Sequence, residues 1–441
     1  MTPEEVLKQP RRKETLAIKQ GERVRRIQLI RNRLPEFSPQ GWVRAGEVLG
    51  VTALFLTNFF LLYPFFGGED TVNVFSAPVV PLLASLTETL VPFSYSIRIW
   101  LLVFLLFFPL TFYYFVREIS GRKMTGLVAG LIAVLPMGTF LAARVNLGLF
   151  SEDGAHIASL TFIPLVCLLL LRFLRRGNFW AGVFAAVGTT MVALTSPLGF
   201  VNLTVFMGVI TFSEMLLGQG RLKIMRSLVV LLLTVGFSAF WYNPKFVFLT
   251  INSFQGQLVK QTLANLLPVS FFLVPLLGVF GFLLFENRPQ LQPLFIAFFL
   301  TIAFGLFSLG TGIAHPAHYR FLPAFGVSLA FLLGLLIAGL FDFLNLSPRL
   351  KHLKIIPFPQ ITIGLGLISL VFIVIFVIIG SQSRELGILA QEQVLGLAVE
   401  KKVGVWEIRE QTSLLENILG LMITGLSIVS IGLIERKISK S

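Results

Sequence analysis

Cysteine is almost absent from this chain of 441 residues, since Cys167 is the only one. A lone cysteine inside an apolar run excludes a disulfide framework and a thiolate metal cluster. Charged residues are also scarce, at 13% of the chain, whereas a soluble domain has roughly 25%. Hydrophobic residues make up 55% of the chain, and the mean hydropathy is +0.84. The composition therefore predicts a membrane protein and excludes a soluble globular domain.

Acidic residues are fewer than basic ones, at 22 Asp and Glu against 36 Lys and Arg, which gives a net charge of +14. In a chain of this hydropathy the excess is an orientation signal rather than a sign of nucleic-acid binding. The chain also lacks a nucleotide-binding P-loop, a GxGxxG motif and a zinc motif. We therefore expect neither DNA binding nor ATP-driven transport by this chain alone.

Apolar runs long enough to cross a bilayer recur along the chain. A membrane-spanning helix needs about 20 mainly apolar residues, and this window predicts an all-α, polytopic transmembrane protein of about twelve spans. Ser196 and Pro197 interrupt one apolar stretch and predict a break between two antiparallel helices. The predicted spans are 45–66, 96–116, 124–143, 156–173, 179–195, 198–217, 227–242, 266–285, 291–309, 321–343, 361–379 and 414–434.

The distribution of Lys and Arg predicts the orientation. An even number of spans places both termini on one side, and that side then holds 27 of the 36 basic residues, which leaves 9 for the other. Because cytoplasmic loops carry most Lys and Arg, both termini are expected in the cytoplasm. The chain then divides into a basic tail (1–44), a transmembrane module (45–343) and a C-terminal two-span unit (344–441) with an outer cap segment (381–413).

Ionisable residues gather at the predicted outer ends of the helices. Such a group costs about 2.5–3.5 kcal/mol at the bilayer centre unless it is paired or solvated, and few occur in the middle of a span. We expect three groups on the outer face to converge in one site. They are Glu69 and Asp70 after the first span, Glu152, Asp153 and His156 at the start of the fourth, and His315, His318 and Arg320 before the tenth.

Each group also has a purely structural explanation. Glu152 and Asp153 at a helix N-terminus can cap free N–H groups and complement the helix dipole. Asp70 can be a solvated turn residue, and Arg320 can extend to the lipid headgroups. Glu214, near an inner helix end, is expected to be solvated or paired locally.

The arrangement resembles the GT-C superfamily of polytopic glycosyltransferases, which use polyprenyl-phosphate-linked sugars on the outer side of the membrane. The resemblance lies in Asp70 in the first outer loop, Glu152-Asp153 with His156 where the third span meets the fourth, and Arg320-Phe321 at the start of a late span. It covers about residues 45–343. The helix spacing and the Thr-Ser-Pro joint are also similar to those of the bacterial and archaeal membrane proteins labelled as related to pyruvoyl-tetrahydropterin synthase, which are themselves GT-C-like.

The resemblance implies a protein in the inner membrane of a prokaryote that transfers a sugar from a polyprenyl-phosphate donor to an acceptor on the outer face. Such a reaction needs a carboxylate to deprotonate the acceptor hydroxyl and cations to offset charge on the departing phosphate. Asp70 would be the base, and Arg320 with His318 would hold the phosphate. Glu152 and Asp153, the other candidate catalytic residues, would hold a divalent ion or orient the acceptor.

The remaining expectations concern ligands and partners. Mg²⁺ or Mn²⁺ is the candidate cofactor, with Asp70 and Asp153 as its candidate ligands. The expected partners are the donor lipid and membrane lipids, without nucleic acid. The candidate substrate-binding residues are Glu69, His156, His315, His318 and Arg320.

Two other functions stay open. A transporter or lipid flippase commonly has a similar number of spans, but transporters bind their substrates near the bilayer midplane on broken helices. The ionisable groups of this sequence lie at the outer rim instead, which favours the enzyme. The third function is a catalytically silent scaffold of GT-C type.

Overall fold

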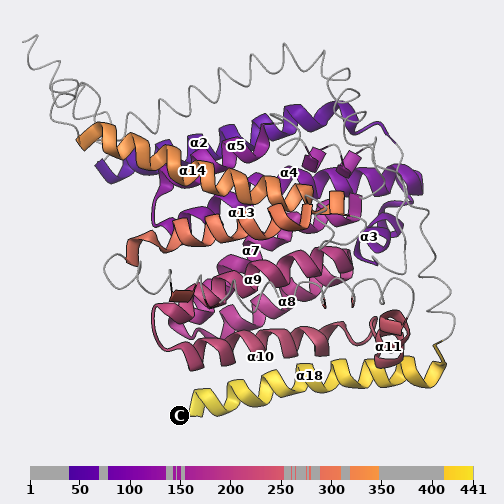
Figure 1. The fold of residues 1–441 in the computed structure, drawn as a ribbon. Helices are drawn as coiled ribbons and strands as arrows, with labels where there is room; N and C mark the ends of the chain where they lie inside the picture. Colours follow the sequence, from indigo (N-terminus) through magenta and orange to yellow (C-terminus); the bar gives the residue numbers. More distant parts are fainter. Residues whose placement is uncertain are drawn as a thin grey trace, which may run out of the picture.

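The computed structural model describes residues 39–68, 78–135, 143–145, 147–149, 154–252, 289–308, 318–346 and 412–440, together with residues 260, 264, 275, 278 and 279. Within these residues all regular structure is helical. The long helices lie side by side in one bundle (Figure 1). They are α2 (Pro39–Leu62), α4 (Phe93–Ser120), α5 (Lys123–Val134), α7 (Gly154–Arg176), α8 (Phe179–Thr195), α9 (Pro197–Leu216), α10 (Gly220–Ser238), α13 (Gln292–Ser308), α14 (Leu322–Leu346) and α18 (Leu414–Lys440).

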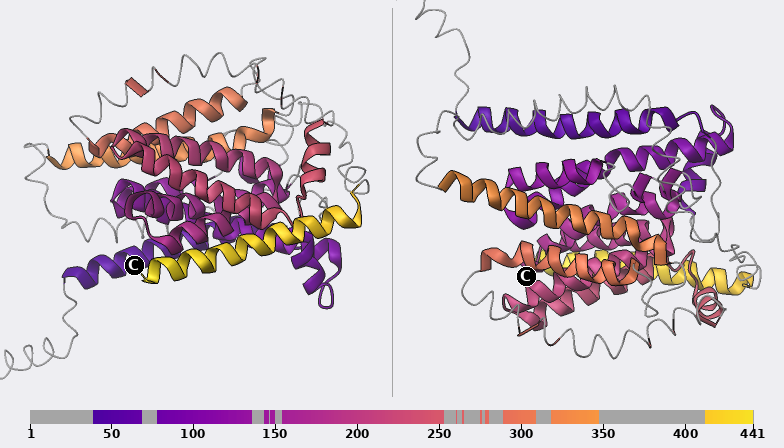
Figure 2. Two further views of the ribbon diagram at one scale, coloured as in Figure 1. Left: turned by 90° about the horizontal axis from the view of Figure 1, so that it is seen from below. Right: turned by 45° about the horizontal axis from the view of Figure 1, so that its top comes forward.

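Short helices lie beside the long ones. α3 (Val79–Thr87) precedes α4, and α11 (Pro244–Asn252) follows α10. Figure 2 (left) shows α11 running across the direction of the long helices. Three 3-10 turns complete the described elements, namely η1 (Tyr63–Phe65), η2 (Pro289–Leu291) and η3 (His318–Phe321).

Six of the described helices are long and apolar enough to cross a membrane. The prediction of an all-helical protein with several membrane-spanning helices is therefore confirmed. The six helices correspond to Arg44–Phe65, Phe93–Ser120, Gly154–Arg176, Pro197–Leu216, Leu322–Leu340 and Leu414–Leu433, and three shorter apolar helices are α5, α8 and α13. The predicted spans 266–285 and 361–379 lie outside the described residues, apart from residues 275, 278 and 279. The number of twelve spans stays a prediction.

The helices differ strongly in how much the protein covers them. In the most apolar stretch of α7, 72% of the residues are buried, because α4 and α8 pack along this helix. In α18 only 6% is buried, and this helix packs on α10 at the edge of the bundle (Figure 1). Large apolar side chains on the outside of such a bundle are expected to face lipid.

The ion pairs between described residues gather at one end of the bundle, which we call the charged end. There Glu47 of α2 accepts from Arg117 of α4, and its other oxygen lies 2.6 Å from Lys123 Nζ of α5. α2 begins and α18 ends at this end (Figure 1). We call the opposite end, where α2 ends and α4, α7 and α14 begin, the His156 end. The Lys and Arg count assigns the charged end to the cytoplasm, and this orientation stays a prediction.

The predicted break between two helices at Ser196 and Pro197 is confirmed as the junction of α8 and α9. The Ser196 hydroxyl accepts the N–H of Gly199 at 3.2 Å. Pro197 occupies the first turn of α9, where its missing N–H leaves no helical hydrogen bond unmade. Gly199 packs so closely against Ser159 of α7 that a Cβ would collide with it. Small residues therefore let this junction lie directly on the central helix.

Pro109 in the middle of α4 leaves one backbone carbonyl without a partner in its own helix. Proline has no N–H, so the oxygen of Leu105, four residues earlier, has no helical donor. Asn58 of α2 supplies one, since its Nδ2 donates to the Leu105 oxygen at 2.8 Å and to the Leu106 oxygen at 3.1 Å. Because hydrocarbon offers no water for such groups, this contact fixes α2 against α4.

Arg144, in the helical stretch 143–145, joins the same contact. Its Nη1 donates to the Leu105 oxygen at 3.3 Å, and its Nη2 donates to Asn58 Oδ1 at 3.2 Å. The guanidinium carbon lies 4.5 Å from the centre of the Phe108 ring, a favourable cation–π geometry. Arg144 directly follows the predicted span 124–143, but its side chain is buried against the middle of α4. Chain order alone does not indicate this position, because the freed carbonyl and the Phe108 ring that accept from Arg144 belong to another helix.

Replacing Asn58 by Ala should lower the free energy of unfolding by about 1–3 kcal/mol, because the buried Leu105 oxygen loses its best donor. Pro109→Ala restores an N–H four residues after Leu105, so the Asn58→Ala change should cost less in that background. Thr52→Ala, on the exposed face of α2, is the control. Denaturation of the four combinations in mixed micelles measures the coupling. Equal losses with and without Pro109 would refute this account.

Candidate functional site

Arg98 lies in the second turn of α4, at the His156 end, and its side chain is buried. Its Nε donates to the carbonyl oxygen of Phe65 at 3.4 Å, and its Nη1 donates to that of Leu149 at 2.9 Å. Phe65 ends η1, directly after α2, and Leu149 belongs to the short helical stretch 147–149 before α7. One guanidinium therefore joins two segments that are far apart in the sequence.

Both segments lead directly into the predicted acidic groups. Gly68, where an added Cβ would lie 3.4 Å from Arg98 Nε, immediately precedes the first acidic pair. Leu149 stands three residues before Glu152. Arg98 was not among the residues predicted for the site. The sequence did carry a signal, because an arginine inside the predicted span 96–116 is costly unless it has acceptors.

His156, in the first turn of α7, is 1% exposed, and its Nε2 lies 3.0 Å from the backbone oxygen of Arg320 in η3. Because a carbonyl can only accept, Nε2 carries the hydrogen in this contact. Gly154, two residues earlier, packs against Leu101 of α4 so tightly that a Cβ would collide with it. The first turn of α7 is therefore in contact with the third turn of α4 and with the turn before α14.

Of the residues predicted for the site, His156 and Arg320 are thus adjacent, and Arg320 is half-buried. For His318 the structure describes the backbone in η3 but not the side chain. The convergence of the acidic groups with Arg320 stays a prediction. The predicted site residues that lie outside the described residues are Glu69, Asp70, Glu152, Asp153 and His315.

The metal prediction concerns two of those residues, Asp70 and Asp153, and is therefore open. Within the part of the chain that the structure describes, no three His, Cys, Asp or Glu side chains are grouped as metal ligands would be. Mg²⁺ and Mn²⁺ prefer oxygen ligands, which the two carboxylates would supply.

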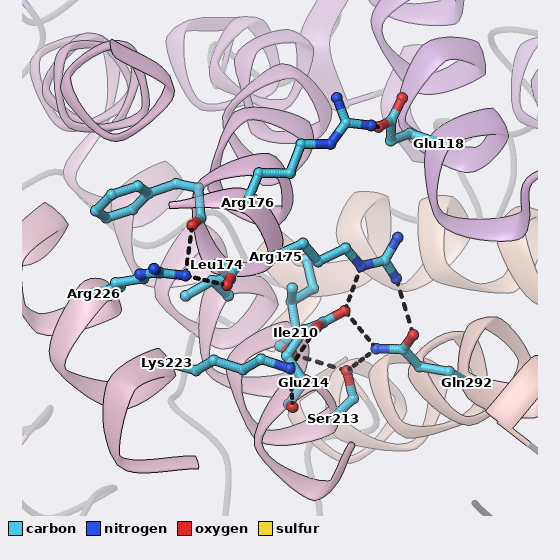
Figure 3. Close-up of polar contacts among 11 residues, drawn as sticks. Glu118, Leu174, Arg175, Arg176, Ile210, Ser213, Glu214, Lys223, Arg226 and Gln292 are labelled. Carbon is cyan, nitrogen blue, oxygen red and sulfur yellow. Dashed lines mark hydrogen bonds and ion pairs between the residues drawn. The ribbon is translucent and has the colours of Figure 1, made fainter. Parts of the chain in front are cut away.

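A second polar cluster lies at the charged end (Figure 3). Glu214, in the last turn of α9, is 2% exposed, and its Oε1 accepts from Arg175 Nε and from Gln292 Nε2, each at 2.8 Å. Its Oε2 accepts from Lys223 Nζ at 3.0 Å. The side-chain oxygen of Gln292 accepts from Arg175 Nη2 at 2.9 Å, and its Nε2 also donates to Ser213 Oγ at 3.2 Å. Solvation or local pairing was expected for Glu214, and the structure shows it buried and paired with side chains from three other helices.

This cluster ties four helices together, since its members come from α7, α9, α10 and α13. Both oxygens of Glu214 are occupied by donors, so the carboxylate has little capacity left for a substrate. Buried polar networks whose members are all satisfied rigidify a fold. We therefore assign the cluster at the charged end a structural role and place the candidate functional site at the His156 end.

Comparison of the chain with protein-family models, with curated proteins and with solved structures gives no match in any of the three.

Removing the charge of Glu214 should destabilise the protein far more than removing that of Glu118. Glu214→Gln leaves Arg175 and Lys223 without a carboxylate and should cost about 3 kcal/mol. Glu118→Gln is a matched control at the same end, because its partner Arg172 has an exposed side chain, and such pairs contribute about 0–1 kcal/mol. Chemical denaturation in mixed micelles measures both. Similar small losses would contradict the structural role of the cluster.

Arg98→Met should release both segments that Arg98 joins. Cysteines placed at Asp70 and Asp153, in a Cys167→Ala background, should then react about tenfold faster with an impermeant maleimide added outside cells, since two charge-assisted hydrogen bonds are lost. Arg98→Lys should restore part of the protection. Arg122→Met, an exposed cation at the other end of α4, should leave both rates unchanged. Faster labelling at only one cysteine would argue against a shared anchor.

Proposed function

We propose that the protein is a membrane glycosyltransferase that moves a sugar from a polyprenyl-phosphate donor to an acceptor on the outer face of a prokaryotic cytoplasmic membrane. The observation that carries this proposal is the meeting of distant segments at the His156 end. His156 contacts the backbone of Arg320, and Arg98 contacts the carbonyls that precede both predicted acidic groups. Cations are thereby held close to the chain positions that carry the carboxylates.

The membrane setting supports a lipid-linked donor. The described helices expose many large apolar side chains, as a protein in contact with hydrocarbon does. A polyprenyl tail can therefore stay in the bilayer while its phosphate lies at the rim, level with the starts of α4 and α7. This arrangement brings the sugar to the site without a soluble nucleotide-binding domain.

The proposed reaction is a displacement at the anomeric carbon. The acceptor hydroxyl oxygen forms the new glycosidic bond, and Asp70 takes the hydroxyl proton. The bond between the anomeric carbon and the phosphate oxygen breaks, and polyprenyl phosphate leaves with the bonding electrons. Arg320 and His318 would stabilise the charge that develops on this phosphate. Glu152 and Asp153 would orient the acceptor or, with Asp70, hold Mg²⁺ or Mn²⁺.

Transport is the second candidate function, and Arg144 is the observation that favours it. Its guanidinium is buried at the middle of α4, and in the described part of the chain it has neutral acceptors but no carboxylate partner. An ionisable group at this depth commonly marks a substrate or ion path. The enzyme remains the better-supported function, because the contacts among distant segments that flank the predicted site lie at the rim.

Two substitutions separate the enzyme from the transporter. Asp70→Asn keeps the shape of the side chain but removes the proton acceptor, so transfer should fall about 100-fold or more while donor binding persists. Arg320→Ala should weaken donor binding and also slow transfer, because the cation interacts with the phosphate in both the ground and the transition state. The assay is the conversion of a radiolabelled polyprenyl-phosphate sugar by membranes that contain each variant.

Matched controls lie at the same end of the bundle. Glu88→Gln, after α3, and Lys245→Ala, in α11, remove exposed charges and should leave transfer unchanged. Equal conversion by wild type and Asp70→Asn would remove Asp70 from the mechanism. Absence of conversion with every donor, together with substrate uptake that depends on Arg144, would favour transport; absence of both activities would favour a silent scaffold.

A further inference from the structure

A groove runs between α9 and α10, in the half of these helices nearer the charged end. Its volume is about 320 Å³. It is open on one side, where Gly208, Ile224 and Leu228 are exposed. It lies far along the bundle from the His156 end and shares no residue with the site described there. The lining residues are Thr204, Met207, Gly208, Thr211, Phe212 and Met215 of α9, and Ile224, Ser227, Leu228 and Leu231 of α10.

The surface of the groove is mainly apolar. Each of its three hydroxyl groups takes part in a hydrogen bond within the protein, because Thr211 donates to Ser227 Oγ at 3.1 Å and Thr204 donates to the Val201 carbonyl at 2.7 Å. From Thr204 to Met215 the lining extends over three turns of α9, which corresponds to about 16 Å at the rise of an α-helix. A narrow apolar groove of this length suits an extended acyl chain rather than a polar solute.

The mouth of the groove is positively charged. Arg221 stands three residues before Ile224 and seven before Leu228, so it lies on the same stripe of α10 as these groove residues. Arg221 is exposed and forms no ion pair with another described residue. Two further cations belong to the same helix start. Lys223 shares Glu214 with another cation, and Arg226 donates to carbonyl oxygens of α7 and lies over the Phe173 ring, without a carboxylate among its described contacts. The positive charge at this point is therefore in excess.

We propose that this groove binds one anionic phospholipid, with an acyl chain between α9 and α10 and the phosphate group at Arg221. The charge argument selects an anionic over a zwitterionic headgroup, because a basic residue near the membrane surface attracts anionic lipid. The lipid belongs to the leaflet on the side of the charged end. This site is independent of the proposed sugar transfer, since it lies at the opposite end of the bundle.

Gly208 provides a direct way to fill the groove. No atom of the described residues lies within 4 Å of a Cβ built at Gly208, so Gly208→Leu introduces a side chain without a collision. Leucine also favours the helix over glycine, so the variant should fold. Gly339→Leu in α14 is the matched control, because Gly339 has the same open surroundings away from the groove.

The test is native mass spectrometry of the purified protein after exchange with dioleoyl-phosphatidylglycerol or dioleoyl-phosphatidylcholine. Wild type and Gly339→Leu should each retain one phosphatidylglycerol, and Gly208→Leu should retain about tenfold less, because its side chain replaces the buried acyl segment. Arg221→Gln should retain lipid but lower the preference for phosphatidylglycerol about fivefold. Arg122→Gln, an exposed cation elsewhere at the charged end, should keep the preference.

Three results would overturn the proposal. Equal retention by wild type and Gly208→Leu would place the retained lipid elsewhere. Equal preference in wild type and Arg221→Gln would remove the headgroup contact. A change in oligomeric state or a lower thermal stability in Gly208→Leu, with lipid retention unchanged, would mean that a second copy or another part of this chain fills the groove.

Discussion

The carbonyl oxygen of Leu105 shows the constraint on which the fold depends: inside hydrocarbon, each polar group must find its partner within the protein. Pro109 withdraws the helical donor of this oxygen, and Asn58 and Arg144 supply donors from two other segments. The resulting contact joins α2, α4 and the stretch 143–145 near mid-bundle. Pro109 therefore does more than weaken its own helix, because the carbonyl that it frees accepts hydrogen bonds that join α4 to other segments.

The two ends of the bundle satisfy their charges in different ways. At the charged end, carboxylates accept from several donors at once, as Glu214 does from Arg175, Lys223 and Gln292. At the His156 end, the described contacts of Arg98 and His156 go to backbone oxygens. These carbonyl oxygens fix the orientation of the guanidinium and of the imidazole. The contacts at the charged end hold helices together, and those at the His156 end join the start of α7 and the second turn of α4 to segments that flank the predicted site.

The sequence predicted much of the fold and only a small part of the candidate site. Apolar length and the Ser196-Pro197 interruption placed α8 and α9 correctly, because both signals are local. The seventh helix was predicted to begin at 227, but α10 begins at Gly220. The first turns of α10 carry three cations, so their hydropathy was too low for the predicted span. In the structure, Lys223 and Arg226 donate to acceptors on other helices. Arg98 was overlooked for a related reason, since its acceptors are carbonyls of distant segments.

The sequence by itself determined that this protein is helical, belongs in a membrane and concentrates its basic residues at alternate helix ends. These properties follow from composition, from the length needed to cross hydrocarbon and from the order of charges along the chain. Only the tertiary structure decided which groups meet. The partners of Arg144, of Glu214 and of His156 come from other helices, and helix packing, which depends on the shapes of many side chains at once, brings them within hydrogen-bonding distance.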